Sequence, residues 1–282
     1  MSKIIDGRGL AEKIKDNIVK DILKLKGKRP NLAIVLVGER EDSKLYVSLK
    51  EREAKKVGID THVYKCHQDI SEIELFETIK FLNRDESIDA ILVQLPLPDG
   101  FDTDGIIMAI DPAKDADGFH PANLEKLFNS CEHEDYIPPV YGVVLEMLNS
   151  INYDLMHKKA CIIANSDIFG RGLAWVLKCK NVYADITDAN DYKLKEKCLS
   201  ADIIISAVGQ PKLIKKNMVK KDAVLIDIGI SKQDGKVCGD VDFDDVEETA
   251  GYITPVPGGV GPMTIAMAFK NTLKLYKRRH SK

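Results

Sequence analysis

A tyrosine and a lysine four residues apart, Tyr46 and Lys50, are the first side chains along the sequence whose pairing could carry chemistry. On a helix, residues with this spacing share one face, so the phenol ring could stack on a substrate while the amine exchanges protons with it. A lysine does acid–base work near neutral pH only where burial lowers its pKa. The spacing alone is more typical of a solvated lysine beside a tyrosine at the edge of the core.

Three more polar residues occupy positions where ligands often bind. Gln94 follows the apolar run 90–93, and if that run is a parallel strand, Gln94 lies at the sheet edge where open α/β sheets bind ligands. Gln94 could equally just end the strand. Asp117 precedes a glycine, which is typical of a turn, although its carboxylate could accept hydrogen bonds from an amino-substituted heterocycle. His120 could titrate near neutrality, but by itself it favours a structural hydrogen bond.

The segment 254–264 has the most unusual composition in the chain. Three prolines and three glycines fall within the eight residues 255–262, and a helical pattern follows at once. Such a rigid loop brings bare backbone N–H groups close to a ligand at the start of a helix. A simple hinge between domains is the alternative, and it accounts less well for this composition.

Length and composition limit the class of protein. A chain of 282 residues suggests two domains, and 44% hydrophobic with 30% charged residues is typical of a soluble globular protein. The net charge of -3 provides no overall field for binding a nucleic acid or an anionic membrane. Neither a signal peptide nor a membrane span of roughly 18 apolar residues is evident. We therefore expect a cytoplasmic protein with no nucleic-acid or membrane partner.

The cysteines give no sign of a metal site. Six are scattered through the chain, without a Cys-x-x-Cys pair and without the Cys/His spacing of a zinc site. In a chain of this size with no secretion signal, this pattern favours reduced thiols over a disulfide framework. We expect no bound metal.

Two series of alternating strands and helices must position these residues. Each series implies parallel strands joined by right-handed helical crossovers, so the fold class is α/β. The second series resembles the winding of a Rossmann-like dinucleotide-binding domain. The strands expected in the first series are 32–37, 61–66 and 90–93, with helices over 43–57 and 71–83. The strands expected in the second are 160–164, 181–186, 203–207 and 224–227, with helices over 142–149, 170–179, 192–199 and 263–278.

The motifs together resemble one enzyme family. Ser43, Tyr46 and Lys50 come first, followed by the Gln-Leu-Pro-Leu-Pro sequence that starts at Gln94. The segments 114–120, 201–209, 227–230, 239–241 and 254–264 then appear in the family's order. Over nearly its whole length the chain is similar to bifunctional methylenetetrahydrofolate dehydrogenase/methenyltetrahydrofolate cyclohydrolases. These enzymes oxidise 5,10-methylenetetrahydrofolate with NAD(P)+ and hydrolyse the methenyl product to 10-formyltetrahydrofolate.

The resemblance implies a role for each candidate residue of the folate site. Lys50 would be the central catalytic group, with Gln94 hydrogen-bonded to it and tuning its protonation. Tyr46 would stack on the aminobenzoyl ring, and Asp117 would hold the amino-pyrimidine edge of the pterin. Ser43 would support the lysine site, although it also suits a helix N-cap. Further substrate-binding residues implied by the resemblance are Leu95, Pro255 and Gly259.

The resemblance also implies a dinucleotide site, where this chain departs from the family. The residues concerned are Ala164, Asn165, Ser166, Gly170 and Ile230. NADP is the family default, but NAD is possible because the usual Gly-Arg-Ser and His-Ser elements are altered. An acidic residue about 20 positions past the phosphate loop usually binds the ribose hydroxyl of NAD. Asp185 or Asp188 could do this or could be solvated strand-end residues, and Arg171 could still bind a phosphate.

The expected organisation follows from the same likeness. A catalytic folate-binding domain spans 1–138, with the C-terminal helix 263–282 packing back on it, and a Rossmann-like NAD(P)-binding domain spans 139–262. The folate would lie in a deep cleft between them. The family also implies a homodimer in tetrahydrofolate interconversion, supplying one-carbon units for purine, histidine and methionine biosynthesis.

Three other interpretations remain. A one-activity member of the family would keep only the cyclohydrolase or only an NAD-linked dehydrogenase. A non-catalytic folate or nucleotide binder has no need of Lys50. A two-domain dehydrogenase acting on another substrate, such as an amino acid, does not account for the segment 254–264.

Overall fold

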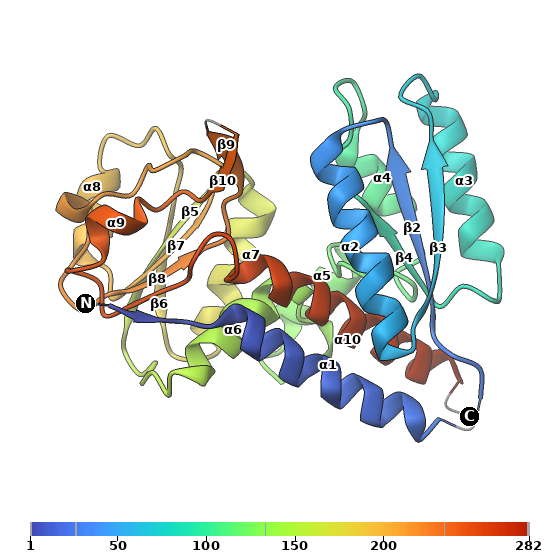
Figure 1. Ribbon diagram of the computed structural model, residues 1–282, viewed down its shortest axis with the longest axis horizontal. Coiled ribbons are helices and arrows are strands. Elements are labelled where there is room, and N and C mark those ends of the chain that lie inside the picture. Colours follow the sequence, from blue (N-terminus) through green and yellow to red (C-terminus); the bar gives the residue numbers. More distant parts are fainter. Residues whose placement is uncertain (1, 26, 133, 234, 281–282) are drawn as a thin grey trace. The chain divides into compact units, whose positions relative to one another are not determined.

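The chain forms two compact units in the computed structural model, which describes residues 2–25, 27–132, 134–233 and 235–280. One unit contains the chain up to Ala11 together with Val140–Thr264, and we call it the six-stranded unit after its main sheet. The other contains Glu12–Pro139 and the chain from Ile265 onward, and we call it the three-stranded unit. The ribbon in Figure 1 shows one parallel sheet with flanking helices in each.

The sheet of the three-stranded unit has the order β3-β2-β4, with all strands parallel. Alternate residues of the central strand β2 face two separate cores. Leu32, Ile34 and Leu36 pack in a cluster that also contains Phe269, whereas Ala33 and Val35 pack in the opposite cluster. The strands are β2 (Asn31–Val37), β3 (Asp60–Cys66) and β4 (Ala90–Val93). The helices of this part of the chain are α2 (Glu41–Val57), α3 (Glu72–Arg84), α4 (Thr103–Ala109) and α5 (Pro121–Asn129), with a 3-10 turn at Glu134–Tyr136.

Local sequence signals set the helix ends around this sheet. Gly58 ends α2 in the left-handed conformation at φ 85°, which suits glycine because it lacks a Cβ. Ser71 and Glu74 form a capping box at the start of α3. The helical period of residues 71–83 predicts an apolar face of Ile73, Phe76, Ile79 and Leu82, and this prediction is wrong at one position. Ile73 is 75% exposed, and Leu75 takes its place in the core beside Ile79.

The sheet of the six-stranded unit has the order β1-β11-β8-β7-β5-β6, and every neighbouring pair is parallel. The first strand of the βα series, β5, lies between β6 and β7, so the strand order reverses beside β5. The strands are β1 (Lys3–Ile4), β5 (Lys159–Ala164), β6 (Tyr183–Thr187), β7 (Ile203–Ala207), β8 (Val224–Asp227) and β11 (Tyr252–Ile253), with a hairpin of β9 (Ser231–Gln233) and β10 (Lys236–Cys238). The helices are α6 (Pro139–Ser150), α7 (Asp167–Lys178), α8 (Leu194–Ser200) and α9 (Phe243–Val246), with a 3-10 turn at Lys216–Met218.

The division into units runs through two helices, α1 (Gly7–Leu23) and α10 (Val260–His280). It also differs from the expected domain boundaries at the start of the chain. Strand β1 pairs with β11, because Lys3 lies opposite Tyr252 and Ile4 opposite Ile253. The first residues of the chain therefore belong to the sheet of the six-stranded unit.

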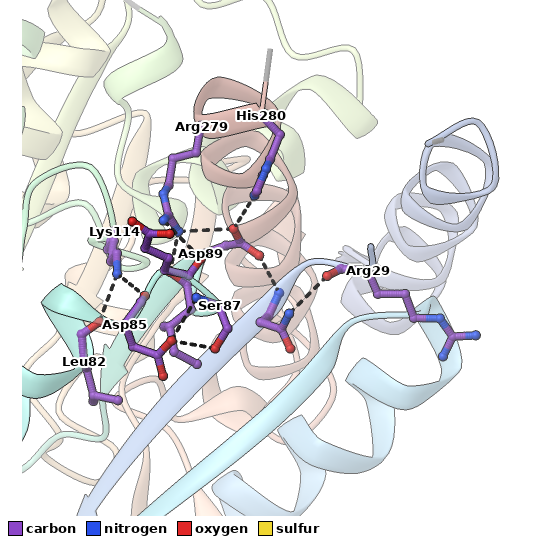
Figure 2. Close-up of polar contacts among 11 residues, drawn as sticks. Arg29, Leu82, Asp85, Ser87, Asp89, Lys114, Arg279 and His280 are labelled. Atoms are coloured by element: carbon purple, nitrogen blue, oxygen red, sulfur yellow. Dashed lines mark hydrogen bonds and ion pairs between the residues drawn. The ribbon is translucent and has the colours of Figure 1, made fainter. Parts of the chain in front are cut away.

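Within the three-stranded unit, the C-terminal end of α10 contacts the sheet at the amino ends of the strands. Figure 2 shows the contacts: Asp89, just before β4, accepts a hydrogen bond from Arg279 at 3.2 Å, and His280 Nε2 lies 2.9 Å from the same carboxylate oxygen. The other oxygen of Asp89 accepts the backbone N–H of Asn31 at 2.9 Å. We call this group the amino-edge cluster.

Cysteine chemistry departs in part from the expectation. Cys66, Cys161, Cys198 and Cys238 are free thiols, as expected. Cys131 and Cys179 are disulfide-bonded, so the expectation is wrong for these two residues. Across the described ranges, no helix is long and apolar enough to span a membrane.

Candidate functional site

Lys50 and Gln94 meet at the carboxyl edge of the three-stranded sheet. Lys50 lies in the second half of α2, and Gln94 follows β4 directly. The Lys50 Nζ atom donates a hydrogen bond to Gln94 Oε1 at 2.8 Å. Gln94 is itself held at both ends, because its backbone N–H donates to the Val35 carbonyl at 2.8 Å and its Nε2 donates to the Leu95 carbonyl at 2.7 Å. The amide oxygen is thereby fixed toward the amine.

Burial changes the protonation of this group. It lowers the pKa of Lys50, while the nearby negative charge of Asp117 acts in the opposite direction. Burial raises the pKa of Asp117 to about 6, partly offset by Lys50 and reinforced by Asp115. A lysine and a carboxyl group therefore interact where both charged forms are disfavoured, which is typical of a functional site.

The loop that carries Asp117 is shaped by a neighbouring aspartate that the sequence reasoning missed. Asp115 is buried and accepts the backbone N–H groups of Gly118 at 2.9 Å and His120 at 2.8 Å. Asn123 donates to the same carboxylate at 3.2 Å. Asp115 rather than Asp117 makes the hydrogen bonds of this turn, which leaves the Asp117 carboxyl group available for a ligand. His120 caps α5 by accepting the Ala122 N–H, in agreement with its structural interpretation.

The remaining folate-site candidates in this unit have different surroundings. Tyr46 lies one turn before Lys50 on α2, is half-buried, and has its pKa raised by burial. Ser43 is buried at the third position of α2, so the N-cap alternative is wrong, because Arg40 holds that position. Leu95 is exposed. Tyr46, Lys50, Gln94 and Asp117 thus belong to one unit, with Ser43 on the same helix as the first two.

Pro255 and Gly259 lie in the six-stranded unit, after β11. The Gly259 N–H donates to the Pro255 carbonyl at 2.7 Å, which closes a tight turn just before α10. A side chain at Gly259 would lie 2.6 Å from the Pro255 carbonyl oxygen, so the turn has room for glycine alone. Both residues therefore belong to one rigid turn.

The dinucleotide-site candidates line the carboxyl edge of β5 and the start of α7. Ala164 ends β5, and Ser166 is the N-cap of α7, where its hydroxyl accepts the Phe169 N–H. Gly170 is buried, and a Cβ there would lie 2.7 Å from Ile186, so this glycine allows α7 to approach β6. A helix N-terminus at the point where strand order reverses suits the phosphates of a dinucleotide. These residues fit such a cofactor.

The other residues named for the dinucleotide site differ in their hydrogen bonds and in their positions on the sheet. Asn165 donates from Nδ2 to the Val208 carbonyl at 3.0 Å and so is already engaged. Arg171 pairs with Asp167 at 2.9 Å on the exposed face of α7. Asp188 follows β6 directly at the carboxyl edge, whereas Asp185 lies within the strand opposite Cys161. Ile230 is exposed in the loop after β8.

The sequence matches two family models, one over the part of the chain with Lys50 and one over the part with the dinucleotide-site candidates. Residues 5–117 match the catalytic domain of tetrahydrofolate dehydrogenase/cyclohydrolase. Residues 138–280 match the NAD(P)-binding domain of the same family. Lys50, Gln94 and Asp117 lie in the first match, and the β5–α7 edge lies in the second.

Known proteins are similar over the full length. A "Bifunctional protein FolD" of Nitratiruptor sp. is 45% identical over 280 residues, covering 98% of this chain and 99% of the relative. One of Sulfurihydrogenibium sp. is 46% identical over 282 residues, covering 98% of each.

Solved structures agree with these relatives. The bifunctional methylenetetrahydrofolate dehydrogenase/cyclohydrolase of Campylobacter jejuni superposes with a TM-score of 0.93 at 39% identity, covering 99% of this chain and 100% of that one. The corresponding enzyme of Trypanosoma brucei, complexed with NADP and an inhibitor, gives 0.93 at 32% identity, covering 99% of this chain and 98% of that one. The chain therefore belongs to the tetrahydrofolate dehydrogenase/cyclohydrolase family.

Proposed function

We propose that this chain carries out both reactions of its family, oxidising 5,10-methylenetetrahydrofolate and hydrolysing the resulting 5,10-methenyl compound to 10-formyltetrahydrofolate. The observation that carries the proposal is the hydrogen bond from Lys50 to Gln94, in a setting that lowers the pKa of the amine. The relatives that match over the full length are bifunctional by name. Neither this match nor the intact Lys50 and Gln94 favours a one-activity enzyme.

The chemistry assigned to Lys50 is proton transfer. Water adds to the methenyl carbon, and its proton must leave before the ring opens at one of the two nitrogens that the carbon joins. A neutral amine can accept that proton and return it to the departing nitrogen. The positive charge of the methenyl substrate would lower the pKa of Lys50 further, because two like charges disfavour each other. Gln94 presents an oxygen to the amine and so fixes where its lone pair points.

The substrate contacts follow the family pattern. Asp117, whose carboxyl group the local turn leaves available, would accept hydrogen bonds from the amino-pyrimidine edge of the pterin. Tyr46 would stack on the aminobenzoyl ring, and Ser43 would support the helix face that carries Lys50. Leu95, Pro255 and Gly259 complete the proposed folate contacts.

The bound dinucleotide supplies the acceptor for the hydride that leaves the methylene carbon. Ala164, Asn165, Ser166 and Gly170 would hold its phosphates at the start of α7, with Ile230 beyond the ends of the strands. The structure of the T. brucei relative is a complex with NADP. In this chain, however, Arg171 is paired with Asp167, and Asp188 adds a negative charge at the end of β6. We therefore propose that NAD is used at least as efficiently as NADP.

A spectrophotometric assay tests both activities together. Methylenetetrahydrofolate is supplied with NAD or NADP, and the methenyl absorbance is followed as it rises and then decays. The wild type should show both phases, whereas Lys50→Met should accumulate the methenyl compound without enzymatic decay. Decay at the wild-type rate in this variant would remove Lys50 from the mechanism.

The choice of cofactor is tested by the ratio of kcat/KM for NAD and NADP. Asp188→Ser should raise the relative efficiency of NADP, because it removes a charge that repels the 2′-phosphate. Asp185→Ser is the matched control, since Asp185 lies inside the strand. A wild-type preference for NADP of more than about tenfold would contradict the proposal.

We also propose a homodimer, on the family resemblance and on the position of β6 at one end of the six-stranded sheet. An end strand leaves backbone groups available for association. Light scattering after gel filtration would give twice the 31.4 kDa mass of the chain, and a monomer at micromolar concentration would contradict it.

A further inference from the structure

Two aspartates are buried at the carboxyl edge of the six-stranded sheet. Asp227 ends β8 and is 2% exposed, and Asp240 follows β10 and is fully buried. Neither forms an ion pair within the described ranges. Such burial is costly unless hydrogen bonds compensate for the lost hydration, so their partners define what the carboxylates do.

Asp240 holds the end of β7. Its Oδ2 atom accepts the hydroxyl of Ser206 at 2.7 Å and the backbone N–H of Val208 at 2.9 Å. Its Oδ1 atom is buried, has no hydrogen-bond partner in the part of the chain that the structure describes, and packs against Gly229, where an added Cβ would lie 2.1 Å from that oxygen. The carboxylate therefore fits tightly into its site, with little freedom to move.

Asp227 in turn holds the segment that carries Asp240. Its Oδ1 accepts the backbone N–H of Asp240 at 3.1 Å and that of Gly229 at 3.0 Å, and its Oδ2 accepts that of Val241 at 2.8 Å. Burial and the charge of Asp240 raise the pKa of Asp227 to about 7, although its backbone donors act in the opposite direction. Hydrogen bonds through the two carboxyl groups thus connect the end of β8 to the end of β7.

The turn that these two aspartates hold, Val208–Gly209, lies where a dinucleotide would bind. Asp240 holds the N–H of Val208, and Asn165 holds its carbonyl oxygen at 3.0 Å, so both sides of this residue are fixed. Gly209 follows with φ 68°. Asn165 follows β5 and Val208 follows β7, the two strands between which the order reverses. Dinucleotides cross a doubly wound sheet at this reversal.

We infer that Asp240 is a positioning residue for the dinucleotide, acting through the Val208–Gly209 turn, with Asp227 holding Asp240 in place. The inference rests on the proposed use of this edge by NAD or NADP, and it holds for either cofactor. Ser206 shares the carboxylate oxygen and has a smaller part. None of these three side chains is assigned to contact the substrate.

Substitution of Asp240 by asparagine tests the inference. The amide can still present its oxygen to Ser206 and Val208 if its NH₂ group takes the position of Oδ1 against Gly229, so the Val208 N–H exchanges a charged acceptor for a neutral one. We expect the KM for the dinucleotide to rise about tenfold or more, while kcat and the KM for methylenetetrahydrofolate stay within about twofold. Ser206→Ala, which leaves the bond to Val208 in place, should raise the dinucleotide KM by less than about threefold.

A matched control separates positioning from stability. Asp89 is also a buried, hydrogen-bonded aspartate, but it lies in the three-stranded unit, far along the chain from the dinucleotide edge. Asp89→Asn should lower Tm as Asp240→Asn does, without changing the dinucleotide KM. If Asp240→Asn lowers Tm but leaves that KM within about twofold of wild type, the inference is wrong.

Cyclohydrolase activity separates a defect in the dinucleotide site from a defect at Lys50. Hydrolysis of methenyltetrahydrofolate needs no dinucleotide, so Asp240→Asn should retain it while Lys50→Met loses it. If Asp240→Asn is insoluble, Asn165→Ala tests the other side of the same turn, and titration with NADH measures binding directly. Unchanged NADH affinity in Asn165→Ala would then overturn the inference.

Discussion

The two edges of the three-stranded sheet each contain a buried lysine near an aspartate, yet they treat these charges in opposite ways. At the amino edge, Lys114 donates to the carbonyl oxygens of Leu82 at 2.9 Å and Asp85 at 2.7 Å, which lie in the last turn and at the C-cap of α3. Asp89 nearby has Arg279 and His280 as partners. At the carboxyl edge, Lys50 donates to one neutral amide, and Asp117 has no hydrogen-bonded partner among the described residues.

The difference shows that residue type does not decide the role of a buried charge. Burial lowers the pKa of both lysines, so the pKa alone does not distinguish them. The number of satisfied hydrogen bonds does. The polar groups at the amino edge hold α10 and α3 in place, whereas those at the carboxyl edge are left available to bond a substrate.

Replacing the two lysines should give the largest effects, on cyclohydrolase activity for Lys50 and on thermal stability for Lys114. Lys50→Met should lower cyclohydrolase activity by about 10²-fold or more, because a general acid–base group is lost, with Tm unchanged or raised. Lys114→Met should lower Tm and leave kcat/KM unchanged at temperatures where the protein is folded. Activity assays and thermal unfolding of both variants test this difference in role. An equal loss of activity in the two variants would show that Lys50 and Lys114 do not differ in role.

Asp89→Ala should have the next largest effect, and on stability alone. It leaves Arg279 without its carboxylate partner, and breaking a buried pair typically costs about 3–5 kcal/mol of unfolding free energy. Denaturant titration measures this loss. A destabilisation below about 1 kcal/mol would mean that the cluster is only a surface ion pair.

Asp117→Asn should stabilise the unliganded protein while weakening folate binding. Because burial raises the pKa of Asp117 to about 6, its ionised form is less favourable in the folded chain than in the unfolded one. The penalty is absent below the unfolded pKa near 4, grows through about pH 6 and is complete above it, with an upper bound of about 3 kcal/mol. Unfolding of both proteins at about pH 4 and about pH 8 should therefore show a gain only at the higher pH. An equal gain at both values would rule out ionisation as the cause.

His280→Ala should have the smallest effect. Its ring lies half-exposed beside Asp89, and Arg279 still holds the same oxygen. We expect a loss of less than about 1 kcal/mol, measured by denaturant titration near neutral pH. A loss as large as that of Asp89→Ala would show that His280 rather than Arg279 compensates the buried carboxylate.

Much of the fold could be predicted because short apolar runs between breakers have few alternatives. The strands β4, β7 and β8 have the expected bounds, and β2, β3 and β5 differ by one residue. The face of α3 could not be fixed in the same way. Ile73 fits the helical period as well as Leu75 does, and only the packing against β2 decides between them.

The candidate site was predictable where chemistry and spacing coincide, as at Tyr46 and Lys50. The hydrogen bond between Lys50 and Gln94 joins residues 44 positions apart, and no local pattern encodes it. Asp115 and Asp240 were missed for a related reason. Their importance comes from backbone N–H groups brought to them by the fold, and backbone groups leave no trace in the sequence.

The composition of the three-stranded unit has a consequence for the order of events during synthesis. Its core cluster includes Phe269 and Leu273 of α10, which the ribosome adds only after the whole of Val140–Thr264. The strands β2, β3 and β4 therefore emerge long before the helix that covers one of their faces. The six-stranded unit, although mostly encoded later, can complete its own sheet first. Until α10 is synthesised, the half of the chain that carries Lys50 leaves part of this apolar face uncovered, and such transient exposure makes a nascent chain prone to aggregation.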